Sequence, residues 1–424
     1  MRHFAAQLRH HRFCHAVQIH PVAGQLGAAN GGIAVVIVAS HRHILRHPVA
    51  VALERLHQIV RYLIAVADEG FRHFMGQRER HELALIVPVL QPPVVPEYAD
   101  GTEAAAFVFD HAVVTPGKPQ LPGLPMFRTG EGVETLSVFL KDAGGLAVEL
   151  RYSVYEAEDL ITRTAVYTNA GTQPLTLHKA ASLSVDFAPD ALELITLNGT
   201  WAAERTPERA ALRCGIQSIG SMRGIPGHAH NPAVALCHTD TTETTGSAWG
   251  FALVYSGSFQ IEAERADGGQ RLVMGIHPYH FHWTLAPGER FTAPEAAMVY
   301  SDKGLGEMSR RFHTAIRTRL LPPHWQDMTA PRPVLINSWE ACYFDFDEQK
   351  LLELAQAAKK ADIDLFVLDD GWFKGRNDTS SSLGDWVADT RKLPQGLPGL
   401  CKKINLLGAG HGALGGAGGH QPGQ

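Results

Sequence analysis

Short segments of alternating apolar and polar side chains fill residues 91–330, and this pattern constrains the fold more than any other feature of the chain. Three of them are LAVELRYSVYEA (146–157), LITRTAVYTN (160–169) and PLTLHKAASLSVDF (174–187). Alternation with a period of two is typical of antiparallel strands that bury one face. Strands repeated over 240 residues bury those faces by packing two sheets against each other, which predicts a β-sandwich of unusual size.

Two details of this stretch follow from the same prediction. Its tryptophans, including Trp201 and Trp283, are expected to pack in the core or in an interface. The segment HPYHFHW (277–283) is expected to be a strand with histidines on its polar face, because no third ligand is in view to suggest a metal site.

The hydrophobic period changes at Pro331. Two compact apolar runs of strand type alternate from there with two amphipathic helical patterns: PVLINSW (333–339), Phe346–Ala361, DLFVLDDGW (364–372) and Leu397–Leu407. This order predicts βαβ units with parallel strands, the building blocks of a (β/α)8 barrel. Barrels of this kind carry their sites at the carboxyl ends of the strands.

Asp369 and Asp370 directly follow the second apolar run, so they are expected at such an end. Carboxylate oxygens accept hydrogen bonds from neighbouring hydroxyl groups, and an indole ring stacks on the apolar face of a sugar. With Trp372 beside it and Trp339 after the preceding strand, the pair predicts a sugar-binding site. A helix cap or a solvated loop for the pair, and core packing for Trp339, are the alternatives. Two further acidic residues are expected to be structural: Glu340 and Asp385.

Residues 1–90 differ from the rest in composition. They contain ten Arg, eleven His and no Lys, and their net charge is +5 (ten Arg against four Glu and one Asp), whereas the other 334 residues carry −10. Metal binding by the histidines and nucleic-acid binding by the arginines are two interpretations. We favour a third, in which the segment is not native to the following domain, because GC-rich DNA translated in a wrong frame or strand gives this composition.

The run PRPVLINSWEACYFDFDEQKLLELAQAAKKADIDLFVLDDGWFKGRNDTSSSLGDWVADTRKLPQGLPGL (331–400) resembles the opening of the catalytic barrel of family 36 glycoside hydrolases, the bacterial α-galactosidases or melibiases. Five upstream segments resemble the N-terminal β-supersandwich of that family: KPQLPGLP (118–125), GIQSIGSMRG (215–224), HAHNP (228–232), VYSGSF (254–259) and LAPGERFTAPEAAMVYSDKGLGEMSRRFH (285–313). The resemblance implies a β-supersandwich over residues 91–330 and the first βα units of an incomplete (β/α)8 barrel over residues 331–408.

The resemblance also implies a function. Members are retaining enzymes that remove terminal α-D-galactose from melibiose and raffinose-type sugars, usually as cytoplasmic homo-oligomers and often as tetramers; no cofactor or metal is expected. In the family, the two aspartates of LDDGW bind the galactose 4- and 6-hydroxyls, and the tryptophan of NxWEA lines the pocket. These roles fall here to Asp369, Asp370 and Trp339.

No motif of the chain matches the two catalytic residues of the family, a nucleophilic Asp at the fourth barrel strand and an acid/base Asp near the sixth. A full barrel takes roughly 250 residues, and 78 lie between Pro331 and Gly408. We therefore expect a truncated chain that has sugar contacts, no catalytic residue and no hydrolytic activity. The alternative is a non-catalytic carbohydrate-binding protein.

Residues 409–424, AGHGALGGAGGHQPGQ, are rich in glycine and carry no strand pattern. Codons can be chosen for Leu414–Gly423 that, read one base later, give Trp-Val-Glu-Pro-Glu, close to the third strand of the family. We therefore expect out-of-frame translation after Gly408. Sequencing the DNA there tests this, because the hypothesis fails if no one-base shift restores a WxEPE-like sequence.

Five cysteines without paired spacing suggest neither a disulfide framework nor a zinc site. The longest apolar runs fall well short of the roughly 20 residues that span a bilayer, and the charged start MRHFAAQLRHH is unlike a secretory signal. These features predict a cytoplasmic protein without a membrane or nucleic-acid partner. Specificity for α-N-acetylgalactosamine and galactosyl transfer are further alternatives within the family.

Overall fold

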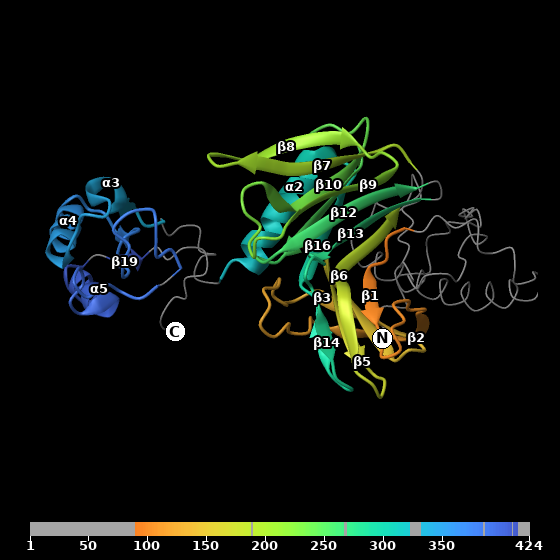
Figure 1. Ribbon diagram of the computed structural model, residues 1–424. Coiled ribbons are helices and arrows are strands. Elements are labelled where there is room, and N and C mark those ends of the chain that lie inside the picture. Colours follow the sequence, from red (N-terminus) through yellow and green to blue (C-terminus); the bar gives the residue numbers. More distant parts are fainter. Residues whose placement is uncertain are drawn as a thin grey trace, which may run out of the picture. The chain divides into compact units, whose positions relative to one another are not determined.

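The computed structural model describes residues 90–187, 190–266, 269–322, 332–384 and 386–408, together with the backbone of 410–413. These residues divide into two compact units, one ending at Leu321 and the other beginning at Pro322 (Figure 1). The predictions made for the first 89 residues, metal and nucleic-acid binding among them, lie outside the described residues. No helix in the described part of the chain is long and apolar enough to cross a membrane.

The first unit is a sandwich of two sheets whose strand pairs are all antiparallel within the described residues. The smaller sheet runs β1-β6-β13-β12-β9, with β14 paired to β6. Its bounds are β1 (Val94–Glu97), β6 (Leu175–Phe187), β13 (Gly269–Ile276), β12 (Phe259–Ala266), β9 (Gly215–Ser221) and β14 (Trp283–Leu285).

The larger sheet runs β2-β3-β4-β5-β16-β11-β10-β7-β8, with β15 paired to β5. Its bounds are β2 (Val108–Pro116), β3 (Val133–Lys141), β4 (Leu146–Tyr155), β5 (Leu160–Asn169), β16 (Glu295–Ser301), β11 (Ala248–Val254), β10 (His230–His238), β7 (Leu192–Thr200), β8 (Ala203–Ala211) and β15 (Arg290–Thr292). Strands β4, β5 and β6 fall within the three segments whose alternation predicted them, so that prediction is confirmed.

Side chains from both sheets form the core of the sandwich. One apolar cluster includes Leu146 of β4 and Leu177 of β6, and a second includes Leu183 of β6 and Phe251 of β11. Because each cluster draws on both sheets, the inward faces are buried against each other, as the period-two pattern requires.

Helices at the end of the first unit differ from the sequence-based expectation of strands alone. Helix α2 (Gly304–Ala315) is followed by a short π-helix, η3 (Ile316–Leu320). Met308 and Phe312 pack from α2 against a buried cluster that includes Tyr155 and Ala297 of the larger sheet. Their spacing of four residues is helical and was missed within a stretch dominated by strands.

The segment 277–283 is a loop rather than the predicted strand, apart from Trp283, which begins β14. Phe281 N donates to Pro278 O at 3.0 Å, and His280 has a positive φ of 58°. A turn of this kind cannot hold the histidines on one strand face, so the prediction was wrong. Trp201 lies in the β7–β8 turn and is 83% exposed, so of the two predicted roles it does not pack in the core, and a role in an interface stays a prediction.

The second unit contains a parallel sheet with the order β17-β18-β19. Its elements are β17 (Leu335–Asn337), α3 (Trp339–Cys342), α4 (Glu348–Lys360), β18 (Leu365–Leu368), α5 (Gly396–Leu406) and β19 (Gly410–Ala413). Phe366 and Leu368 of β18 share a buried cluster with Leu351 of α4 and Leu400 of α5. The predicted βαβ order is therefore confirmed.

Strand β19 corrects one expectation. Residues 409–424 were expected to contain no strand, yet the backbone of Gly410–Ala413 pairs in parallel with Leu365–Leu368. Strand pairing uses backbone N–H and C=O groups, which a glycine-rich segment also supplies, so the composition did not exclude it.

Candidate active site

The acidic pair lies where the parallel strands end. β18 ends at Leu368, so Asp369 and Asp370 emerge at its carboxyl end. The loop after β17 is bound to the same edge, because Ser338 N donates to Val367 O at 2.9 Å and Asp369 N donates to Ser338 Oγ at 3.0 Å. The structure therefore brings the pair together with the loop that carries Trp339.

Asp369 is oriented by a residue of the neighbouring strand. Asn337, the last residue of β17, donates from Nδ2 to Asp369 Oδ2 at 2.6 Å. Asp370 N donates to Asp369 Oδ1 at 2.7 Å. Each carboxylate oxygen thus accepts one hydrogen bond within the protein and can accept another.

Asp370 is paired with Arg376, whose side chain is 7% exposed. The guanidinium donates to both carboxylate oxygens, from Nη2 to Oδ2 at 2.7 Å and from Nε to Oδ1 at 2.9 Å, and Gly371 N donates to Oδ1 at 2.7 Å. These hydrogen bonds hold the pKa of Asp370 below its usual value. Asp370 is therefore an ionised acceptor at neutral pH.

Lys392 fixes the loops around the pair. Its Nζ donates at 2.9 Å to both Phe344 O and Gly371 O, and it lies 4.7 Å from the centroid of the Phe346 ring. Burial lowers the pKa of Lys392. Gly371 has a φ of +91°, and a Cβ there would lie 3.0 Å from Phe344 Cδ1. The loop after β17 consequently packs directly on the backbone that follows the acidic pair.

Aromatic side chains of the β17–α4 loop form a second feature of the site. Trp339 N donates to Asn337 Oδ1 at 2.7 Å, which ties the start of α3 to the residue that orients Asp369. The Trp339 ring is half-buried and meets Tyr343 and Phe344 edge-on, with centroid distances of 5.1 and 5.0 Å. Trp372 differs from the prediction of a sugar-facing surface, because it is 5% exposed and belongs to the core.

Of the two other acidic candidates, the structure describes Glu340, which makes no contact with the pair. Glu340 is exposed and accepts a hydrogen bond from Tyr343 Oη at 3.0 Å. Asp385 lies outside the described residues. Among the residues that the structure describes, no group of three or more His, Cys, Asp or Glu side chains could hold a metal ion.

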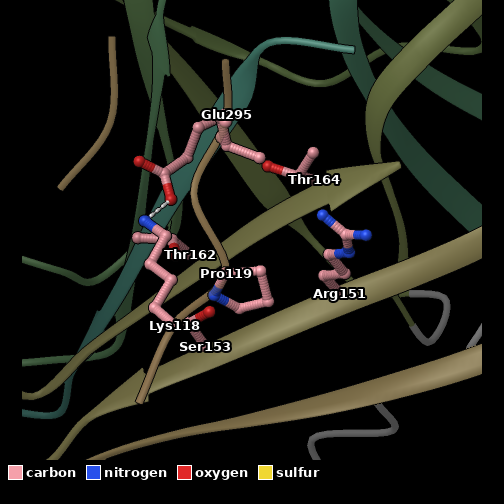
Figure 2. Close-up of a pocket in the computed structure, with 8 residues that line it drawn as sticks. Lys118, Pro119, Arg151, Ser153, Thr162, Thr164 and Glu295 are labelled. Carbon is pink, nitrogen blue, oxygen red and sulfur yellow. Dashed lines mark hydrogen bonds and ion pairs between the residues drawn. The ribbon is translucent and has the colours of Figure 1, made fainter. Parts of the chain in front are cut away.

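A small pocket elsewhere in the chain is structural. It lies in the first unit beside the buried ion pair of Lys118 and Glu295 (Figure 2). Glu295 also accepts from Phe127 N at 2.7 Å, and Lys118 donates to Phe127 O at 2.9 Å. The charges of Lys118 and Glu295 are therefore compensated within the sandwich, so the pair has a structural role.

Comparison with known proteins identifies the family. Residues 89–286 match the glycosyl hydrolase family 36 N-terminal domain, and residues 290–414 match the Melibiase family. The chain belongs to glycoside hydrolase family 36. Alpha-galactosidase AgaA of Geobacillus stearothermophilus is 47% identical over 297 residues, which are 69% of this chain and 40% of AgaA. Alpha-galactosidase 1 of Pediococcus pentosaceus is 41% identical over 75% of this chain and 44% of its own length.

Solved structures of the family agree with the fold. The crystal structure of AgaA superposes with a TM-score of 0.70 at 42% identity, covering 77% of this chain and 46% of AgaA. Variants of AgaA have been solved in complex with stachyose and with raffinose, with TM-scores of 0.70 and 0.71. The chain thus spans less than half the length of these family 36 relatives.

Three residues around the pair escaped the sequence analysis of this family 36 chain: Asn337, Arg376 and Lys392. Asn337 and Arg376 bond directly to the two aspartates, while Lys392 joins the loops on which they stand. A polar residue at the last position of a buried strand was the available signal for Asn337. Arg376 and Lys392 act across loops, where spacing along the chain predicts no contact.

The lowered pKa of Asp370 predicts an acid-sensitive second unit. Since the folded-state pKa is depressed, the ion pair stabilises the fold above the unfolded pKa of about 3.9 and is lost as the pH falls through the folded value. Thermal unfolding followed between pH 5 and pH 2.5 should show a steeper loss of stability for the wild type than for Asp370→Asn. Parallel pH profiles would contradict this account of the pair.

Proposed function

We propose that residues 91–330 and 331–408 are the N-terminal sandwich and the start of the catalytic barrel of an α-galactosidase. In this proposal Asp369 and Asp370 bind the terminal α-D-galactose of melibiose- and raffinose-type sugars, and Trp339 lines the same pocket. The observation that carries it is the oriented acidic pair at the carboxyl ends of parallel strands in a family 36 chain.

The hydrogen bonds of the pair leave room for hydroxyl groups. Asp369 retains one acceptor position on each oxygen, because each is used once within the protein. Both oxygens of Asp370 are occupied within the protein, because Oδ1 accepts from Gly371 N and Arg376 Nε, and Oδ2 accepts from Arg376 Nη2 and, at 3.0 Å, from Arg376 Nε. About two further hydrogen bonds can therefore be accepted, both by Asp369, which is enough for one from each of the neighbouring 4- and 6-hydroxyls of galactose.

The same geometry supports a binding role rather than a cleaving one. Retaining hydrolysis uses two carboxyl groups roughly 5–5.5 Å apart, one as nucleophile and one as proton donor. Asp370 is unsuited to donate a proton at neutral pH because its pKa is lowered, and its oxygens are held by Arg376. We therefore assign no catalytic residue to the described part of the chain.

The edge of β17 supports the proposal that other strands complete the barrel. Val334, Leu335 and Ile336 are consecutive apolar residues with exposed fractions of 59%, 51% and 37%. A strand of a closed barrel is covered on both faces and paired on both edges. These side chains would be buried by the strands that close the sheet in a full-length family 36 enzyme.

Binding of a galactoside by the chain tests the proposed site. The wild-type chain should bind methyl α-D-galactoside with a dissociation constant in the millimolar range, measurable by ligand-observed NMR. Methyl α-D-glucoside, which differs in the orientation of the 4-hydroxyl, should bind at least about tenfold more weakly, since one hydrogen bond to a charged group contributes about 1.5–3 kcal/mol. Equal binding of the two epimers would refute the assignment of Asp369 and Asp370.

We further propose that the protein forms homo-oligomers, as the family resemblance implies. The supporting feature is β8, whose nine residues are all exposed at one edge of the larger sheet, next to the exposed Trp201. Exposed edge strands pair readily with other chains. Light scattering coupled to size-exclusion chromatography should give a multiple of the 46.2 kDa chain mass, and a monomer would argue against this assembly.

A cytoplasmic location is also proposed. The four cysteines in the described residues, Cys214, Cys237, Cys342 and Cys401, are all free. Free thiols persist in reducing compartments, where disulfides are rare.

A further inference from the structure

We propose that Tyr343 contacts the second sugar of the substrate, the one joined to the anomeric carbon of the bound galactose, and so contributes to the choice of substrate. This inference rests on the proposed galactose site. It is drawn from the backbone conformation of Tyr343, the exposure of its ring and its position beside Trp339.

The backbone of Tyr343 is strained. Its φ of +45° and ψ of −120° lie in a region that L residues with a side chain rarely adopt and that glycine adopts readily. Strain of this kind persists only where neighbouring structure imposes it, and it clusters at functional sites.

Hydrogen bonds on both sides hold Tyr343 in this conformation. Before it, the buried Cys342 donates from its backbone N to Ser338 O at 3.2 Å, and Tyr343 N donates to Trp339 O at 2.8 Å. After it, Lys392 Nζ binds Phe344 O at 2.9 Å. The turn is therefore fixed by the same residues that arrange the loops around Asp370.

Packing of the ring does not explain why a tyrosine occupies this position. The side chain is 52% exposed, so little of the cost of the strain is offset by burial. The rings of Tyr343 and Trp339 are perpendicular, at an interplanar angle of 89°, so they are not stacked face to face. Its hydroxyl is bound to Glu340 at 3.0 Å, which restricts rotation of the ring.

A second pyranose matches the chemistry of this surface. Sugar rings present apolar C–H groups on one face, which pack on aromatic rings, and hydroxyls at their rim, which donate to carboxylates. Tyr343 supplies the ring and Glu340 supplies the carboxylate, while Trp339 contacts the Tyr343 ring and donates from its backbone N to Asn337, the residue that orients Asp369. The ligand class is therefore an α-galactoside whose aglycone is itself a sugar, such as melibiose.

Sugar affinities and thermal stability of the full chain test this inference together. Dissociation constants of melibiose and of methyl α-D-galactoside are measured by ligand-observed NMR for wild type, Tyr343→Gly, Tyr343→Ala and Tyr343→Phe. The wild type should prefer melibiose by about threefold to tenfold, the range expected for one aromatic contact. Tyr343→Gly and Tyr343→Ala should lose that preference and still bind methyl α-D-galactoside, whereas Tyr343→Phe should retain most of it.

Stability separates a binding role from a structural one. Because glycine relieves the strain, Tyr343→Gly should unfold at a higher temperature than Tyr343→Ala, and at a temperature no lower than the wild type. The inference is overturned if the melibiose preference is unchanged in Tyr343→Gly and Tyr343→Ala, or if the wild type shows none. Failure of the wild type to bind methyl α-D-galactoside contradicts the galactose site itself and overturns both proposals.

Discussion

A polypeptide of these 424 residues should release no nitrophenol from p-nitrophenyl α-D-galactoside above the uncatalysed rate. The described acidic pair is built to accept hydrogen bonds, and a retaining mechanism needs a second carboxyl group on the other side of the glycosidic bond. Joining residues 91–408 to the matching C-terminal part of AgaA should supply the remaining strands and both catalytic groups. Activity of that chimera should exceed that of the 424-residue chain by about a million-fold or more, the usual lower range of enzymatic acceleration.

The comparison of activity between the chimera and the 424-residue chain has two controls. The C-terminal part of AgaA expressed alone should be inactive, because it lacks the galactose-binding pair. Circular dichroism must show that the chimera is folded. Turnover by the 424-residue chain at an ordinary enzymatic rate would contradict the prediction that this chain carries no catalytic residue, and a folded but inactive chimera would contradict the proposed function.

Arg376→Met should strongly destabilise the second unit and leave the sandwich intact. The substitution keeps the length of the side chain but removes the only guanidinium bonded to Asp370 among the described residues. Removing one partner of a largely buried ion pair leaves the other charge uncompensated, and this costs about 3 kcal/mol or more of folding free energy. A domain of this size has a stability of only about 5 kcal/mol, so most of it would be lost. The second unit has its own apolar cluster, separate from those of the sandwich.

Hydrogen exchange followed by mass spectrometry measures this effect for each unit. Peptides covering β18 and α5 should exchange rapidly in Arg376→Met, while peptides of β4 and β5 remain protected. The matched control is Lys350→Met, which removes the cation of the Lys350–Asp345 pair, whose two side chains are both exposed, and exposed pairs contribute about 1 kcal/mol or less. Equal protection of β18 in the two variants would show that the Asp370–Arg376 pair does not stabilise the unit.

Local periodicity predicted the elements that bury one face. Strand β5 is the predicted LITRTAVYTN segment, and helices α4 and α5 lie within one or two residues of their predicted bounds. Asp347 illustrates why, because its side chain accepts a hydrogen bond from Lys350 N and so fixes the start of α4 from local sequence alone. The predicted βαβ order made the two strands parallel neighbours, and so it correctly predicted that Asp369 and Trp339 follow strand ends at the same edge of the sheet.

Features that depend on distant contacts could not be predicted. Trp372 was expected to face a sugar, but it lies in the core with Phe373 and Trp386, contacts that follow from the path of the loop after β18. Arg376 binds Asp370 from a loop position with no periodic pattern. Strand β19 forms through backbone pairing in a glycine-rich segment, which side-chain patterns do not report.

Galactose recognition by the acidic pair is tested most directly by replacing Asp369 in the active chimera. Asp369→Asn keeps the size of the side chain but replaces one carboxylate oxygen by an NH₂ group, which cannot accept a hydrogen bond from a galactose hydroxyl, and it removes the negative charge. The kcat/KM for the α-galactoside should therefore fall by about a hundredfold or more. The control is Glu353→Gln, the same change on the exposed surface of α4. A kcat/KM for Asp369→Asn that equals that of Glu353→Gln would contradict the site.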